Sequence, residues 1–204
     1  MSKTIAILAP GAMGSAVARR LGENGARVLT SLKGRSEATL KRAADAGMVG
    51  AEDDAIADAD IILSIVPPGE AVALAERLAA LIVRRAKKPV VVDCNAVNVD
   101  TVQRIEEIIG SAQAPFVDAG IIGFPPQRGG KSPAFYMSGE HANDVAVLRI
   151  SASTCGLSKV RSARRRRSKC PTPASSRASQ ASARPWWSQQ RRRARPMRCA
   201  TSLR

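Results

Sequence analysis

The last quarter of this chain lacks acidic residues altogether. Residues 151–204 contain no Asp or Glu but 13 Arg and two Lys, whereas residues 1–150 carry 17 acidic and 17 basic residues. The whole formal net charge of +15 therefore arises from the tail. A single fold seldom changes composition so abruptly, so we interpret residues 1–150 and residues 151–204 as two separate regions.

Cysteine and long apolar runs are scarce in the first region. Cys94 is its only cysteine, so no disulfide can form within it, and we expect a reducing, cytoplasmic location. We interpret Cys94 as a small buried side chain. The apolar run at residues 5–8 is followed by Pro10 and Gly11, and it is too short for a signal sequence or a membrane span. The first region is thus predicted to be a soluble domain without a membrane partner.

The first region does contain short apolar runs that alternate with helical patterns. Runs typical of strands occur at residues 5–8, 27–30, 61–66, 90–93, 116–118 and 135–137. The spacing of apolar residues between them predicts helices that begin near Met13, Ser36, Val72 and Val99. Strands without polar alternation are buried on both faces. The pattern therefore predicts an α/β fold with a doubly wound, mostly parallel sheet of the Rossmann type.

A glycine-containing loop joins the first predicted strand to the first predicted helix. Residues 9–14 read Ala-Pro-Gly-Ala-Met-Gly, which is the G-x-G-x-x-G pattern with alanine at the first glycine. Gly11 would let the backbone approach a pyrophosphate, and Gly14 would let the helix pack closely on the strand. The alternative is a tight turn without a ligand. The position of the loop favours a dinucleotide site formed by Gly11, Ala12, Met13 and Gly14.

The loop after the second predicted strand is basic. NAD-binding proteins usually place an acidic residue there to hold the ribose hydroxyls, but the first acid in this loop is Glu37. Lys33 and Arg35, with the hydroxyls of Ser31 and Ser36, can instead hold a 2′-phosphate. We therefore predict NADP as the cofactor. NAD stays possible, because basic residues in a loop are often only solvated charge.

With these motifs, residues 4–148 resemble the β-hydroxyacid dehydrogenase and 6-phosphogluconate dehydrogenase-like family. The matching segments are Gly11-Ala12-Met13-Gly14, Val66-Pro67-Pro68, Asp93-Cys94-Asn95-Ala96 and Asp118-Ala119-Gly120-Ile121-Ile122-Gly123. The resemblance implies hydride transfer between NADP and a hydroxyacid-type substrate. It further implies a homodimer and a helical C-terminal domain that supplies a catalytic lysine.

The resemblance also extends the predicted site. It places Val66, Pro67 and Asn95 at the cofactor, and Asn95, Ile122 and Gly123 at the substrate. The chain departs from the family at both substrate segments. Asn95-Ala96 stands where hydroxyacid enzymes often have Ser-Thr, and the segment that contains Ile122 and Gly123 stands where Ser-Gly-Gly is common. The identity of the substrate is therefore left open, and no metal site is predicted.

The basic tail admits three interpretations. Its arginine runs at residues 164–167 and 191–193 are typical of an arm that binds nucleic acid through phosphates. A solvated, disordered extension is the second interpretation. The third is a coding sequence read in the wrong frame. The codons of Trp186 and Trp187, shifted by two bases, must encode valine, and the neighbouring codons permit a helical sequence that contains acids. We favour a frameshifted remnant of the helical domain and do not expect nucleic-acid binding.

A frameshift has a direct consequence for catalysis. Lys159 and Lys169 lie outside any helical pattern, so no residue is assigned the role of the catalytic lysine. We expect dinucleotide binding with little or no turnover and loss of the dimer. The competing hypotheses are an active NADP-dependent dehydrogenase, a non-catalytic dinucleotide-binding remnant, and a Rossmann domain fused to a nucleic-acid-binding arm.

Overall fold

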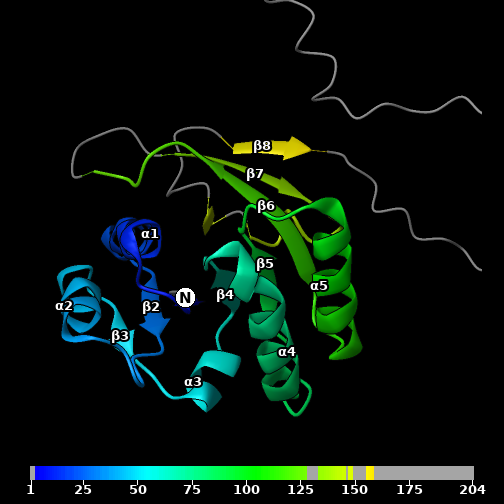
Figure 1. Cartoon of the computed structure of the whole chain (residues 1–204), viewed down its shortest axis with the longest axis horizontal. Coiled ribbons are helices and arrows are strands. Elements are labelled where there is room, and N and C mark those ends of the chain that lie inside the picture. Colours follow the sequence, from blue (N-terminus) through cyan, green and yellow to red (C-terminus); the bar gives the residue numbers. More distant parts are fainter. Residues whose placement is uncertain (1–2, 128–132, 146, 149–154, 159–204) are drawn as a thin grey trace, which may run out of the picture. The chain divides into compact units, whose positions relative to one another are not determined.

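The computed structural model describes residues 3–127, 133–145, 147–148 and 155–158. Over these residues the chain forms an eight-stranded sheet with the strand order β3-β2-β1-β4-β5-β6-β7-β8 (Figure 1). The strands are β1 (Thr4–Ile7), β2 (Arg27–Thr30), β3 (Val49–Gly50), β4 (Ile61–Ser64), β5 (Val90–Asp93), β6 (Phe116–Ile122), β7 (Ala134–Ser138) and β8 (Cys155–Ser158). Only the β6–β7 pair is antiparallel among them. The predicted doubly wound, mostly parallel α/β fold is confirmed.

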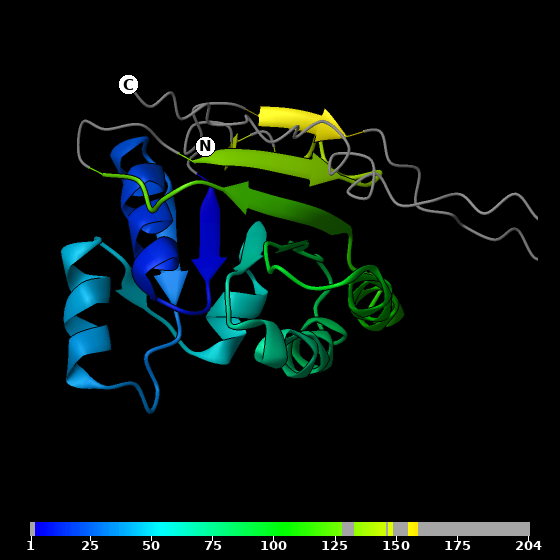
Figure 2. The same cartoon turned by 45° about the horizontal axis from the view of Figure 1, so that its top comes forward.

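Helices cover both faces of the sheet (Figure 2). They are α1 (Ala12–Glu23), α2 (Glu37–Asp45), α3 (Asp53–Ala57), the 3-10 turn η1 (Pro68–Glu70), α4 (Ala71–Ile82) and α5 (Val99–Ser111). No helix in the described part of the chain is long and apolar enough to cross a lipid bilayer.

Two hydrophobic cores explain why the strands are apolar on both faces. Ile5 and Ile7 of β1 pack with α1 and α2 in one core. The residue between them, Ala6, packs with α3, α4 and α5 in the other. Because successive side chains of a strand point to opposite faces, a sheet covered on both sides needs an unbroken apolar run. Cys94 lies buried in the first core, as predicted.

The observed elements differ from the sequence predictions in several places. The strand predicted over residues 61–66 ends at Ser64, and the chain then turns toward Pro67. Strand β3 has two residues and helix α3 has five, and both were missed because neither is long enough to show a period. Strands β6 and β7 extend beyond the predicted residues 116–118 and 135–137.

The sheet continues past the break in composition. Strand β8 pairs in parallel with β7, with Phe135 opposite Cys155 and Ser138 opposite Ser158. These four residues lie in the region that we interpreted as the basic tail. The arginine runs, the proposed frameshift and the predicted disorder of the tail lie outside the described residues and stay predictions.

Candidate functional site

The strand order reverses between β1 and β4. From β1 the chain builds outward through β2 and β3, and it then returns to β4 and builds outward on the other side. Loops from adjacent strands diverge at such a point and leave a crevice beyond the carboxyl ends of the strands, where ligands of this fold bind. The predicted site residues follow the ends of β1, β2, β4, β5 and β6, so the topology directs them to one edge of the sheet.

The two glycines of the loop after β1 have different surroundings. A Cβ added to Gly14 would lie 2.3 Å from the carbonyl oxygen of Ala9 and 3.3 Å from Cγ2 of Ile7. A Cβ added to Gly11 would meet no atom within 4 Å. Gly14 therefore permits the close approach of α1 to β1, while Gly11 leaves open space in front of the helix.

The N-terminus of α1 is open to an anion. The first turn contains no acidic residue, and no side chain caps it. The first helical backbone hydrogen bond runs from the amide of Ser15 to the carbonyl of Gly11 over 2.9 Å. The amides of Ala12 and Met13 precede this bond and have no intrahelical acceptor. Such amides, at the positive end of the helix dipole, are a common phosphate site.

The loop between β2 and α2 presents the predicted basic residues beside the glycine loop. Lys33, Arg35 and Ser36 are exposed, whereas Ser31 is buried at the base of the loop. The guanidinium Nη2 of Arg35 reaches the carbonyl oxygen of Leu8 over 3.4 Å. The structure thus brings three of the four residues expected at a 2′-phosphate to the surface, and it withdraws the fourth from solvent.

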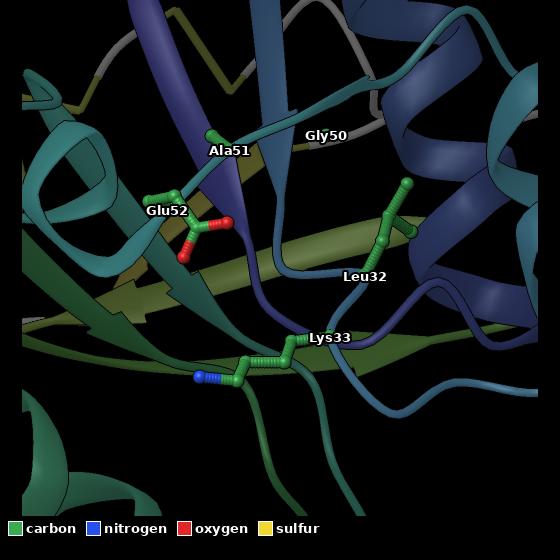
Figure 3. Close-up of a pocket in the computed structure, with 5 residues that line it drawn as sticks. All are labelled: Leu32, Lys33, Gly50, Ala51 and Glu52. Atoms are coloured by element: carbon green, nitrogen blue, oxygen red, sulfur yellow. The ribbon is translucent and has the colours of Figure 1, made fainter.

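A pocket lies between this loop and the end of β3. It is lined by Leu32, Lys33, Gly50, Ala51 and Glu52, and Figure 3 shows the charged ends of Lys33 and Glu52 away from the Leu32 side chain. Leu32 packs so closely that a Cβ at Gly50 would lie 2.9 Å from its Cδ1. Sequence reasoning missed Glu52, because it follows a two-residue strand that shows no periodic pattern.

Arg42 is a second residue that the sequence did not indicate. It lies in the last turn of α2, and its Nη1 donates to the carbonyl oxygen of Pro10 over 3.0 Å. The only signal in the sequence is a basic residue on a predicted helix, which usually faces solvent. Its reach to the glycine loop depends on how α2 packs against the end of β1.

At the ends of β4 and β5, buried polar side chains bond to one another. Asn95 is 9% exposed. Its Nδ2 donates to Oγ of Ser64 over 2.7 Å and to Oδ1 of Asp93. Its Oδ1 accepts from the amide of Val66 over 2.7 Å. Both amide hydrogens are therefore engaged inside the protein, and Asn95 holds the Val66-Pro67 turn against the end of β5.

Burial shapes the electrostatics of this cluster. Burial raises the pKa of Asp93 to about 6, against the hydrogen bonds from Ser64 and Asn95 that lower it, and the neighbouring charge of Asp118 raises it further. Burial also raises the pKa of Asp118, while a hydrogen bond from Ser138 opposes the shift. Within the described residues, Oδ2 of Asp93 is buried without a hydrogen-bond partner. Such an environment favours the neutral carboxyl group.

The thiol of Cys94 lies beside this cluster. Burial, together with the charges of Asp93 and Asp118, raises its pKa. A buried, protonated thiol is a poor nucleophile, so Cys94 serves packing. No group of three or more His, Cys, Asp or Glu side chains that can hold a metal occurs in the described ranges.

The predicted substrate residues at the end of β6 are exposed. Ile122 is 64% exposed and Phe124 is 89% exposed. Gly123 between them has a φ of +129°, and a Cβ there would lie 3.3 Å from Cα of Pro133. The glycine is thus required by the backbone conformation. The two apolar side chains beside it offer a surface and no polar group for a carboxylate.

Known structures share this fold. One is a conserved protein of unknown function described as structurally similar to 3-hydroxyacid dehydrogenases, at 26% identity and a TM-score of 0.67, with 76% of this chain and 57% of that chain covered. Another is the 3-hydroxyisobutyrate dehydrogenase of Mycobacterium tuberculosis with L-serine, at 23% identity and a TM-score of 0.61, with 76% and 54% covered. The chain thus spans little more than half the length of each.

A third solved structure contains a nucleotide. It is an imine reductase variant from Myxococcus stipitatus in complex with NAD⁺, at 20% identity and a TM-score of 0.64, with 76% of this chain and 54% of that chain covered. No curated protein matches the chain.

Residues 4–147 match the family described as the NAD binding domain of 6-phosphogluconate dehydrogenase. The match covers the sheet from β1 through β7 and includes the glycine loop, the basic loop and the Asn95 cluster. This chain therefore belongs to the family of NAD-binding domains of 6-phosphogluconate dehydrogenase.

Proposed function

We propose that this chain binds NADP(H) as the nucleotide-binding domain of a hydroxyacid dehydrogenase-like oxidoreductase, and that it binds NAD(H) more weakly. The observation that carries this proposal is the open N-terminus of α1 beside a loop with two exposed basic residues and no acid. Solved structures with this fold include a 3-hydroxyisobutyrate dehydrogenase and an NAD⁺-bound imine reductase. They support the assignment of this domain to a nicotinamide-dependent oxidoreductase.

The residues at the site fit a dinucleotide. A Cβ at Gly11 would meet no atom within 4 Å, so a pyrophosphate would approach the backbone there without a clash, and the amides of Ala12 and Met13 would bind its oxygens. Lys33 and Arg35 would pair with the 2′-phosphate, because two cations in one loop match its double charge. A nicotinamide ring, when bound, accepts or donates a hydride.

The proposal includes a catalytic deficit. In the family that the sequence resembles, a lysine on the helical domain is expected to move the proton. Two lysines of the domain lie in the loop between α4 and β5 and already have partners. Lys87 pairs with Asp60, and Lys88 donates to the carbonyls of Ile82 and Val83. We therefore propose that the full chain binds the dinucleotide but does not oxidise hydroxyacids. Turnover of NADP⁺ with a panel of 3-hydroxyacids tests this, and measurable turnover would contradict it.

Titrations of the full chain with NADPH and NADH test cofactor choice. We expect the Lys33→Glu/Arg35→Glu double variant to lose at least about tenfold in NADPH affinity, since each charge-assisted contact to a phosphate contributes on the order of 1 kcal/mol or more. NADH affinity should change far less, because NADH lacks the 2′-phosphate. Lys41→Glu is the matched control, since Lys41 is an exposed base on the neighbouring helix. Equal losses for NADPH and NADH would contradict the assignment.

A further inference from the structure

We propose that Arg42 is a positioning residue of the dinucleotide site, which fixes the peptide between Pro10 and Gly11 so that the glycine loop presents amides, and not a carbonyl, to the pyrophosphate. This inference rests on the proposed function. It adds a residue from the far end of α2 to a site that otherwise consists of loop residues and the start of α1.

The peptide between Pro10 and Gly11 is held at both of its polar atoms. Its carbonyl oxygen accepts from Nη1 of Arg42 over 3.0 Å. Its N–H group, which belongs to Gly11, donates to the carbonyl of Ala9 over 2.8 Å. A peptide unit is planar, so the two contacts together fix its orientation. The carbonyl oxygen therefore points toward the guanidinium group of Arg42 on α2.

The orientation of this peptide decides whether the loop attracts or repels an anion. A carbonyl oxygen that faced the pyrophosphate would place like partial charges together, whereas the present orientation leaves the amides of Ala12 and Met13 in front. Gly11 has no Cβ to resist rotation, and a Cβ there would meet nothing within 4 Å. On its glycine side this peptide is therefore not held by side-chain packing, which gives the contact from Arg42 its importance.

Arg42 is suited to this role by its charge. A guanidinium donor forms a stronger hydrogen bond to a carbonyl than a neutral donor does. Within the described residues Arg42 has no carboxylate partner, unlike Arg20, Arg77, Arg85 and Arg104. Its positive charge is thus not neutralised by an ion pair and adds to the potential of the loop. Four further N–H donors remain on the same group.

Arg42 and Arg35 are expected to act on different parts of the ligand. Arg35 precedes α2, lies in the basic loop, and makes a longer contact of 3.4 Å to the carbonyl of Leu8. Its loss should affect NADPH more than NADH. Because Arg42 acts through the pyrophosphate loop, and both nucleotides carry the pyrophosphate, its loss should weaken NADPH and NADH by the same factor.

The test compares Arg42→Met, which keeps side-chain length without donor or charge, with Arg42→Lys, which restores one donor and the charge. Lys41→Met, on the same helix, is the control for loss of a positive charge. Dissociation constants for NADPH and NADH are measured on the full chain, together with the thermal unfolding midpoint without nucleotide. We expect Arg42→Met to weaken the binding of both nucleotides about threefold to tenfold, which corresponds to the net contribution of one ordinary hydrogen bond. Arg42→Lys should recover part of this loss, and Lys41→Met should bind like the wild type.

Several outcomes would overturn the inference. They are unchanged affinities in Arg42→Met, a loss confined to NADPH, a fall in the unfolding midpoint with unchanged affinities, or an equal loss in Lys41→Met. If Arg42→Met does not fold, Arg42→Gln is judged by the same criteria, since the shorter side chain cannot span the distance to Pro10. Failure of the wild-type chain to bind either nucleotide is a different result, because it refutes the proposed function itself.

Discussion

The two sides of the crevice use polar groups in opposite ways. On the β1–β2 side, Lys33, Arg35 and Ser36 are exposed, and no side chain caps the N-terminus of α1. On the β4–β5 side, Ser64, Asp93 and Asn95 are buried and bond to one another. Exposed donors indicate a surface built to bind, whereas buried polar groups that bond to one another indicate a scaffold. The comparison separates residues that would touch the cofactor from residues that hold the loops in place.

The largest effect is expected from a pair of alanine variants in the glycine loop, which separate a binding role from a packing role on the β1–β2 side. Gly14→Ala should lower the free energy of unfolding by about 3–5 kcal/mol, because its Cβ would overlap the backbone of Ala9 and push α1 off the sheet. Gly11→Ala should leave stability within about 1 kcal/mol of the wild type, since the site is open and its φ of −71° suits alanine. Denaturant unfolding measures both.

Nucleotide titration of the same pair completes the test. Gly11→Ala should lose NADPH affinity although it is folded, because the added methyl group would fill the space assigned to the pyrophosphate. A Gly11→Ala variant that binds NADPH like the wild type would show that the loop is not the phosphate site.

The second test concerns pH and the buried side of the crevice. The pKa of Asp93 is about 6 in the folded chain against a usual value of 3.8, so the folded state binds the proton more tightly than the unfolded state does. The contribution of Asp93 to the free energy of unfolding is therefore fully present below about pH 4, and it is lost as the pH rises from about 4 to about 6. The loss has an upper bound of about 3 kcal/mol, from 1.36 kcal/mol per pKa unit.

Two other carboxylates enter the same pH profile. Burial raises the pKa of Asp118, which adds to the loss. A hydrogen bond from Lys87 lowers the pKa of Asp60, so its stabilisation grows as the pH rises and opposes the loss at the acidic end. Unfolding midpoints across pH 4–7 should decline less steeply in Asp93→Asn than in the wild type. A wild-type profile that rises through this range, and is unchanged by Asp93→Asn, would show that Asp93 is not buried as a neutral group.

The third test compares Asn95→Ala on the buried side with Lys33→Ala on the open side. Asn95→Ala removes the acceptor of the Val66 amide and a donor to Ser64, which should lower the free energy of unfolding by about 2 kcal/mol. Lys33→Ala, on the open side, should change stability by less than about 0.5 kcal/mol. If Asn95→Ala is as stable as Lys33→Ala, the two sides of the crevice do not differ in the way described.

The fold could be predicted because its signals are local. The central strands are short, mostly apolar runs and each long helix repeats apolar residues at helical spacing, so residues 27–30 matched β2 and the helix predicted to begin near Ser36 begins at Glu37. The glycine loop was recognisable for the same reason, since its meaning depends only on the strand before it and the helix after it. Burial of Cys94 followed from its place at the end of an apolar strand.

Contacts between distant residues could not be predicted in this way. Asn95 was expected at the cofactor and the substrate, and its engagement with Ser64 joins residues 31 positions apart. Arg42 reaches Pro10 across 32 positions. Both depend on how whole elements pack, which no local pattern specifies. The sequence indicated which segments meet at the edge of the sheet, and the structure indicates which side chains remain available there.

The position of β8 changes where this domain is best cut. A boundary drawn from charge alone, at residue 150, removes β8 and leaves β7 as the last strand of the sheet. Strand β7 would then present a row of unpaired N–H and C=O groups, with Tyr136 43% exposed beside them. Such an edge pairs readily with other chains. For anyone preparing the nucleotide-binding domain alone, keeping the residues through Ser158 protects it from association through that edge.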